Sequence, residues 1–366
     1  MVHHRMVHHR MVHYRMVHYR KEADMKRTLV AALVLAILGP SAPAAAQQIT
    51  LKLSHFVPPV APTHATFLVP WAAKVEKASG GRLKIQIYPS MQLGGTPPQL
   101  VDQIKDGVVD MGWTLPGYTA GRFPRTAVME VPFVHTNALA TTLALQDYAE
   151  KYLQDEYKDY HVLLLHVHGG TLVHANKPIL KIEDYEGLKI RTANRAGSVY
   201  LRAVGANPVG APVPEVPQML SKGVIDGALI PYEIARPLKV HELVKYHSEL
   251  AGPQPRLGTS VFLFAMNKAK YESLPADLRK VIDDHSGRHI AAWAGQNWDD
   301  IEKPGKEAAR KAGNHFPVMP LAEVKRVRAA VRPEIEKFLK ELSVAGHFDA
   351  HAAYAEAQAL VKKYTK

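Results

Sequence analysis

Three patterns in the sequence contain residue types suited to catalysis or metal binding, but none has the spacing that such chemistry needs. His168-Gly169-Gly170 could form an oxyanion loop, yet no G-x-S-x-G nucleophile turn follows it. His241-Glu242 and His247 cannot place two imidazoles on one helical face, as a HExxH zinc site does. Asp283-Asp284 and Asp299-Asp300 are adjacent pairs in expected helical runs. Adjacent side chains on a helix point roughly 100° apart, so these pairs indicate surface charges and not an acid/base pair. The sequence therefore predicts no enzyme, no cofactor and no metal site.

The 366 residues include no cysteine, which excludes disulfides, thiolate metal sites, a cysteine nucleophile and a lipoprotein anchor. The net charge is +12, of which the residues before Gln47 contribute +5, so the remainder carries +7. Its Lys and Arg residues are scattered among acids, without a basic run interleaved with aromatics. This pattern is typical of a solvated surface and predicts no nucleic-acid partner.

Two segments precede the globular part of the chain. Residues 1–24 begin with four copies of the pentad MVHHR or MVHYR. The histidines could bind metal, but a gene start placed too far upstream is the better explanation, so we interpret 1–24 as a spurious or low-complexity leader. Residues 25–46 contain a basic start, a short apolar run and Ala44-Ala45-Ala46 before Gln47. They are typical of a cleaved signal peptide and predict export to the periplasm.

The remaining elements must place any functional side chain, and their order indicates an α/β fold. Alternating strands are expected at 49–55 and 82–88, around a helix from 63 to 77, and a helix at 99–106 precedes a strand at 108–113. The second set of strands is expected at 162–167, 188–191, 225–230, 246–249 and 260–267, with helices at 198–204 and 216–222. Helical runs at 278–298, 303–312 and 321–342 follow. Alternating strands and helices predict mostly parallel sheets in two lobes.

Four stretches, taken in order, resemble the DctP-type periplasmic solute-binding proteins of TRAP transporters. They are GRLKIQIYP with QLG (81–94), LVDQIKDGVVD with MEVPF (100–133), GLKIR (187–191), and GA through EV to GVIDG (205–227). NKAKYESLPADL (267–278) also matches, so the resemblance extends from about residue 48 to the C-terminus. It implies a type II-like two-lobe binding protein with hinge strands and a long bridging helix. It also implies that one small organic acid binds in the cleft.

In this resemblance the Arg of the GLKIR motif holds the ligand carboxylate, and here that residue is Arg191. A guanidinium presents a rigid fork of donors that fits a carboxylate. The alternative from the residues alone is a strand-end Arg paired with Glu183 or Asp184.

The sequence also departs from the family pattern for polar acids. A second Arg and an Asn of those members are replaced here by Thr171 and Ile230, and a stacking aromatic by Val213-Pro214. We therefore expect an apolar or aromatic monocarboxylate or a 2-oxo acid in a mostly apolar pocket. The candidate ligand-binding residues, after Arg191, are His55, Phe56, Trp113, Tyr118, His168, Thr171, His174, Asn194, Ile230 and Tyr232. Each aromatic or histidine could instead belong to the core, and Asn194 could cap the helix that follows it.

The expected lobes are 47–167 plus about 257–297, and 168–256 plus about 298–366. The expected partners are a small organic acid and the TRAP membrane permease subunits, and the protein is expected to be a monomer. A C4-dicarboxylate ligand is the first alternative, and it would need a second cation, such as Arg195 or Arg236, in the cleft. A periplasmic enzyme or a sensor with the same cleft is the second.

Overall fold

The structure is a computed structural model that describes residue 25 and residues 48–365. The leader at 1–24 and all of the expected signal peptide except Met25 lie outside these residues. Within the described part, no helix is long and apolar enough to cross a membrane. Of the described residues, 49–365 belong to one compact unit.

The first sheet has five strands in the order β2-β1-β3-β10-β4. Strand β1 runs parallel to both β2 and β3, whereas β10 runs antiparallel to β3 and β4. Leu51 and Leu53 of β1 are fully buried, as the alternating pattern predicts. The strands are β1 Ile49–His55, β2 Leu83–Tyr88, β3 Met111–Thr114, β4 Tyr160–Val167 and β10 Val261–Asn267.

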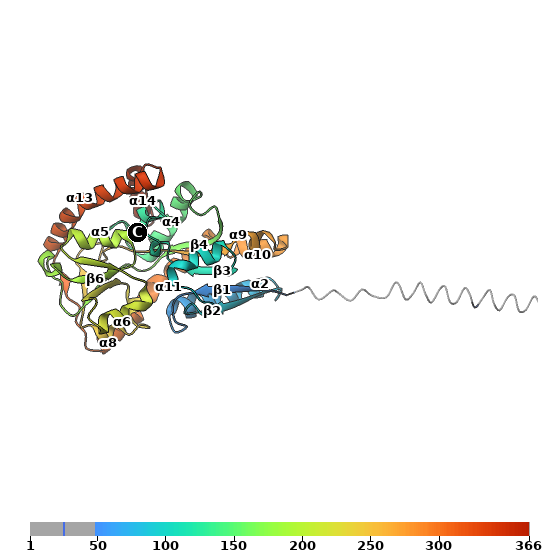
Figure 1. Ribbon diagram of the computed structural model, residues 1–366, viewed down its shortest axis with the longest axis horizontal. Helices are drawn as coiled ribbons and strands as arrows, with labels where there is room; N and C mark the ends of the chain where they lie inside the picture. The colour runs from blue at the N-terminus through green and yellow to red at the C-terminus, as the bar shows by residue number, and fades with distance from the viewer. Residues whose placement is uncertain (1–24, 26–47, 366) are drawn as a thin grey trace, which may run out of the picture. The chain divides into compact units, whose positions relative to one another are not determined.

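The second sheet has six strands in the order β11-β9-β5-β8-β6-β7. Strands β6, β7 and β8 run parallel, with Arg191 of β6 opposite Ala228 of β8, while β5 is antiparallel to β8 and β9. The strands are β5 Leu172–Ala175, β6 Lys189–Thr192, β7 Asn207–Gly210, β8 Gly227–Ile230, β9 Tyr246–Leu250 and β11 Val318–Met319. Two sheets within one α/β chain agree with the expected fold class (Figure 1).

Helices cover both sheets. Those that precede β10 are α2 Val69–Ala78, α3 Leu100–Lys105, α4 Ala138–Tyr152, α5 Arg195–Ala203, α6 Val216–Ser221, α7 Tyr232–Ala235 and α8 Val240–Leu243. Those that follow it are α9 Lys268–Glu272, α10 Ala276–Asp284, α11 Arg288–Asp300, α12 Glu302–Lys311, α13 Leu321–Gly346 and α14 Ala350–Tyr364. Short helical turns complete the set: η1 Thr63–Leu68, η2 Pro97–Gln99, η3 Pro116–Tyr118, η4 Thr126–Glu130, η5 Ile182–Tyr185 and η6 Val213–Glu215.

The chain crosses between the sheets three times, and two of the crossings, from β4 to β5 and from β9 to β10, are adjacent. The two crossings are hydrogen-bonded to each other. The Thr171 amide donates to the Gly258 carbonyl at 2.8 Å, and the Leu257 amide donates to the Thr171 carbonyl at 3.0 Å. These paired segments, which lie outside the named strands, are the hinge crossings between the two lobes.

Helices α11 and α12 form a nearly continuous bridge between the lobes. Ile301 joins them and keeps helical dihedral angles (φ −72°, ψ −11°). Helix α11 packs on α4 and β4 of the first lobe, whereas α12 packs on α7 and α8 of the second lobe. This bridge places Trp298 and Glu302 on either side of the junction.

The C-terminal helix lies elsewhere than expected. The sequence prediction placed residues 298–366 in the second lobe, but α14 packs on α4 and η4, which belong to the first lobe (Figure 1). Helix α13 leads to it, since α13 contacts α5 and η5 as well as η4. The buried face of α14, Ala350, Ala353, Ala357 and Val361, is made of small residues that allow close packing against α4.

Candidate functional site

A cavity lies where the two lobes face each other. Its walls come from the ends of β1, β3 and β10, from the ends of β6 and β8, and from the hinge crossings. The lining residues are Phe56, Val57, Thr63, Trp113, Leu115, Tyr118, His168, Thr171, Arg191, Ala193, Val213, Leu229, Ile230, Pro231, Glu233, Ile234, Ser260 and Phe262. Most of these residues are apolar, with a few polar groups among them, which is the usual composition of a small-molecule site.

Arg191 is the cation of this cavity and is only 2% exposed. Its Nε donates to the Ala211 carbonyl at 2.8 Å, and Nη1 makes a longer contact of 3.4 Å with the Leu229 carbonyl. Its Nη2 is buried without any hydrogen-bond partner among the described residues. Burial lowers the pKa of Arg191 because it disfavours the charged form, although the nearby Tyr118 hydroxyl opposes that shift. The guanidinium is therefore oriented by two carbonyls and keeps one nitrogen unpaired.

The acids that could have neutralised Arg191 have other partners. Glu183 pairs with Arg326 on the surface. Asp184 accepts from the amides of Leu180 and Lys181 at 2.8 and 3.0 Å. Over residues 48–365, no carboxylate forms an ion pair with Arg191. The structural alternative raised by the sequence is thus wrong, and the buried cation is available to an anion.

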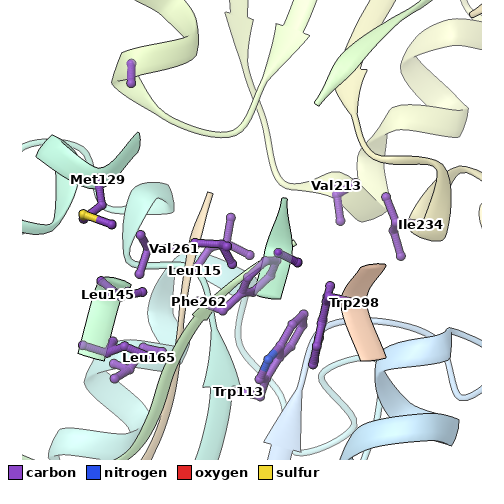
Figure 2. Packing of buried hydrophobic residues seen from close by; sticks show 14 of the residues in the cluster. Trp113, Leu115, Met129, Leu145, Leu165, Val213, Ile234, Val261, Phe262 and Trp298 are labelled. Atoms are coloured by element: carbon purple, nitrogen blue, oxygen red, sulfur yellow. The ribbon is translucent and has the colours of Figure 1, made fainter. Parts of the chain in front are cut away.

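Aromatic rings form the wall contributed by the first lobe. Trp113 stacks on Phe262, with centroids 4.5 Å apart, and on Phe56, at 5.1 Å. The Trp113 indole N–H donates to His166 at 2.8 Å, which fixes the ring. In Figure 2 the rings of Trp113, Phe262 and Trp298 lie below Val213 and Ile234 of the second lobe. Flat, rigid rings on one wall suit a flat apolar ligand.

Tyr118 and His168 are polar residues of the wall whose groups are engaged. The Tyr118 hydroxyl accepts from the Val213 amide at 2.9 Å, and burial raises the Tyr118 pKa. His168 accepts from the Gly170 amide at 3.0 Å and lies 3.2 Å from the Ser260 amide. Burial lowers the pKa of His168 well below its ordinary value, so the ring is neutral. Both ring nitrogens face main-chain amides, which makes His168 a support for the hinge crossing.

Two other polar residues of the wall have unpaired atoms. Glu233, in the first turn of α7, has a buried Oε2 without a hydrogen-bond partner, and so has the Oγ1 of Thr63 from the first lobe. Burial, reinforced by the nearby Glu302 carboxylate, raises the pKa of Glu233 well above its ordinary value. Glu302 itself, with a pKa raised to about 7 by burial, accepts from the amides of Tyr232 and Glu233 at 3.3 and 2.9 Å.

Seven of the expected residues line the cavity: Phe56, Trp113, Tyr118, His168, Thr171, Arg191 and Ile230. The structure does not bring the other four to it. His55 pairs with His64 at 2.9 Å, and burial lowers its pKa to about 3. His174 pairs with His247 at 2.6 Å and contacts the Ile230 carbonyl. Both side chains follow the sheet pleat toward the interior of a lobe, because neighbouring strand residues point to opposite faces.

Tyr232 and Asn194 are the other two. The Tyr232 hydroxyl donates to Glu249 at 3.2 Å, behind the cavity wall. Asn194 caps α5 by accepting from the Gly197 amide at 2.8 Å, as its alternative interpretation predicted. Its amide nitrogen donates to the Ser260 hydroxyl at 3.2 Å, and Asn194 lines an adjoining cavity near the hinge crossings.

Several lining residues were not among the candidates expected from the sequence, including Leu115, Phe262 and Glu233. Leu115 and Phe262 lie at strand ends, but continuous apolar strands do not reveal which residues face a cavity. Glu233 has a weak signal, since it is one acid within an apolar segment, IPYEIA.

The rejected motifs take structural roles. His247 lies against His174 and Asn314. Asp299, expected as a surface charge, instead caps α4 by accepting from the Ala138 and Leu139 amides at 2.8 and 3.0 Å. Among the residues that the structure describes, no group of three or more His, Asp or Glu has a geometry that could hold a metal ion.

Comparison with known proteins connects this site to one family. The family model for bacterial extracellular solute-binding proteins, family 7 (DctP), matches residues 53–342. The C4-dicarboxylate-binding periplasmic protein DctP of Rhodobacter capsulatus is 29% identical over 266 residues, which are 71% of this chain and 78% of that protein.

Solved structures extend the similarity. A TRAP solute-binding protein from Rhodoferax ferrireducens T118, in complex with copurified benzoate, superposes with a TM-score of 0.84 at 42% identity, covering 87% of this chain and 99% of that one. A marine-metagenome TRAP solute-binding protein specific for aromatic acid ligands, in complex with metahydroxyphenylacetate, superposes with a TM-score of 0.85 at 41% identity, covering 87% and 100%. These matches confirm the resemblance seen in the sequence. The chain belongs to family 7 of the bacterial extracellular solute-binding proteins, the DctP-type proteins of TRAP transport.

Proposed function

We propose that this protein captures an aromatic monocarboxylate in the periplasm and delivers it to a TRAP membrane permease, without chemical change. The single observation that carries the proposal is Arg191, a buried guanidinium with an unpaired Nη2 in an aromatic cavity. A buried charge without a counterion is costly, so a site that keeps one is suited to an anionic ligand. The stacked rings of Trp113, Phe56 and Phe262 suit an aromatic body.

The similar proteins support the same ligand class. The Rhodoferax protein was solved with benzoate and the metagenome protein with metahydroxyphenylacetate, at 42% and 41% identity. The signal-like segment at 25–46 supports export, and the family supports a permease as partner.

A dicarboxylate ligand is less well supported, although a relative carries that name. It would need a second cation at the cavity. Arg195 instead pairs with Glu341 at 2.7 Å, and Arg236 is exposed. Neither lines the cavity.

The test is a thermal-unfolding screen of the full-length mature protein with benzoate, phenylacetate, pyruvate and succinate. A ligand at 100 times its Kd stabilises the protein by about 2.7 kcal/mol, which raises Tm by several degrees. We expect the two aromatic acids to raise Tm and to be recovered unchanged by mass spectrometry. Stabilisation by succinate alone would refute the proposal, and recovery of a converted acid would indicate an enzyme.

A further inference from the structure

The cavity wall has more unpaired hydrogen-bonding atoms than an unsubstituted aromatic acid could bind. Three of its lining residues have a buried polar atom without a partner: Arg191 Nη2, Glu233 Oε2 and Thr63 Oγ1. A ligand carboxylate on Arg191 satisfies only the first of these. Buried polar atoms that stay unpaired are rare and costly in folded proteins, so the other two need an explanation.

Glu233 is the more informative of the two because its charge state is constrained. Glu233 is only 4% exposed, and no Lys or Arg forms an ion pair with it among the described residues. Arg256 lies 3.8 Å from Glu249 and 3.9 Å from Glu302, and it forms no ion pair with Glu233 among the described residues. Glu302, whose pKa is raised to about 7, accepts from the amide of Glu233 itself at 2.9 Å, so a carboxyl group that is negatively charged above that pH faces this turn of α7. Ionisation of Glu233 is opposed both by burial and by that charge.

A protonated carboxyl group both donates and accepts a hydrogen bond. A hydroxyl group has the same two capacities, so the two groups pair well. A second carboxylate on the ligand would find no cation beside Glu233 and would lose its hydration. The chemistry of this part of the wall therefore favours a neutral polar substituent.

We infer that Glu233 is a specificity-determining residue, whose protonated carboxyl group hydrogen-bonds a hydroxyl substituent on the ring of the aromatic acid that Arg191 holds. This inference rests on the proposed function and refines it from aromatic acids to hydroxylated aromatic acids. The position of Glu233 is well defined, since Glu302 of the bridging helix caps α7 and fixes its first turn.

Isothermal titration of the full-length mature protein with benzoate, 3-hydroxybenzoate and 4-hydroxybenzoate tests the inference. We expect wild type to bind the better hydroxy isomer about tenfold or more tightly than benzoate, because a site built to bind a hydroxyl group discriminates against the analogue that lacks it. Glu233→Leu should reduce this ratio to about one, whereas Glu233→Gln, which still donates and accepts, should retain most of it. Glu242→Leu, at an exposed glutamate, is the matched control and should keep the full ratio.

The outcomes separate this inference from the proposed function. A ratio that stays within twofold of wild type in Glu233→Leu, or a wild type that prefers benzoate to both isomers, overturns the role of Glu233 while aromatic-acid binding stands. If none of the three acids binds wild type, both proposals fail. Thermal unfolding of each variant verifies that it is folded, and removal of a buried carboxyl should not lower Tm substantially.

Discussion

Replacement of Arg191 by methionine should separate recognition of the carboxylate from recognition of the ring. Methionine is long and flexible, so it fills much of the space without a charge. In the structure, Nη2 is free and Nη1 makes only a 3.4 Å contact with the Leu229 carbonyl, so a carboxylate can take two charge-assisted hydrogen bonds. Each contributes about 1.5–3 kcal/mol, and their loss should weaken binding roughly 10²- to 10⁴-fold.

The assay compares benzoate with benzamide, its uncharged analogue, by isothermal titration. Wild type should strongly prefer benzoate, and Arg191→Met should lose nearly all of that preference. The variant also loses the 2.8 Å bond to the Ala211 carbonyl, so thermal unfolding must be measured in parallel. Arg195→Met is the matched control, because Arg195 pairs with Glu341 on the surface and such pairs contribute little.

The reasoning is refuted if Arg191→Met is folded and still prefers benzoate to benzamide as strongly as wild type does. The carboxylate would then be held by another group. A fall in affinity for both ligands alike would mean that Arg191 shapes the cavity without binding the carboxylate.

Three further predictions concern the wall, the hinge and the bridge. Trp113→Leu removes a ring stacked on two others, so titration should give about tenfold weaker binding of benzoate and a smaller loss for pyruvate, which has no ring. Burial raises the pKa of Glu130 from 4.5 to about 8, so ionisation of this carboxyl group destabilises the folded state. The stabilisation by the protonated form is fully present below pH 4.5 and is lost as the pH rises toward 8. Glu130→Gln should remove up to about 5 kcal/mol of that pH-dependent loss, measured by urea unfolding at pH 4.5 and 8.5. Gly305→Ala would place a Cβ 2.1 Å from the Tyr232 carbonyl and should lower the free energy of unfolding by about 1–3 kcal/mol, whereas Gly210→Ala, with open space around it, should not.

Each of these has an outcome that contradicts it. Equal losses for benzoate and pyruvate would show that Trp113 acts through stability and not through the ring. Parallel pH profiles for wild type and Glu130→Gln would mean that this carboxyl is not the titrating group. An unchanged Tm in Gly305→Ala would mean that α12 and α7 can move apart without cost.

The sequence predicted the elements in which apolar residues recur with a clear helical or strand periodicity. The strand at 49–55 has the expected bounds, and 82–88, 246–249 and 260–267 differ from the structure by one residue at one end. Helix α4 was missed because it is buried against α11, β4 and α14, which removes the polar face that marks a helix. Strands β5 and β7 were missed; β7 includes Pro208, which lacks an amide hydrogen for strand pairing and does not suggest a strand. The helical run at 278–298 is broken between Asp284 and Arg288, where Gly287 precedes α11 with a positive φ of 52° and its amide donates to the Leu163 carbonyl.

The site was predictable to the extent that it lies at strand ends named by a family motif. Arg191 follows that rule through the GLKIR motif, whereas Trp113 and Phe56 were found only from their positions at the ends of expected strands. The prediction was wrong for His55 and His174 because successive strand residues point to opposite faces of a sheet. A shift of one residue therefore decides whether a side chain near a strand end faces the cavity or the interior of the lobe, where both histidines are buried. The environment of Glu233 could not be foreseen, since it depends on Glu302, which approaches from 69 residues further along the chain.

The bridging helix also limits how the lobes can move. Trp298 packs among the rings of the first lobe, and Glu302 is bonded to α7 of the second, with only one helical turn, about 6 Å, between them. Because a helix resists stretching, this turn keeps the distance between Trp298 and Glu302 constant. The two lobes cannot be pulled apart at that point; they can only swing about it. A separation of the lobes would therefore be a rotation about a point beside residue 301, with the widest gap on the side of the cavity farthest from that residue.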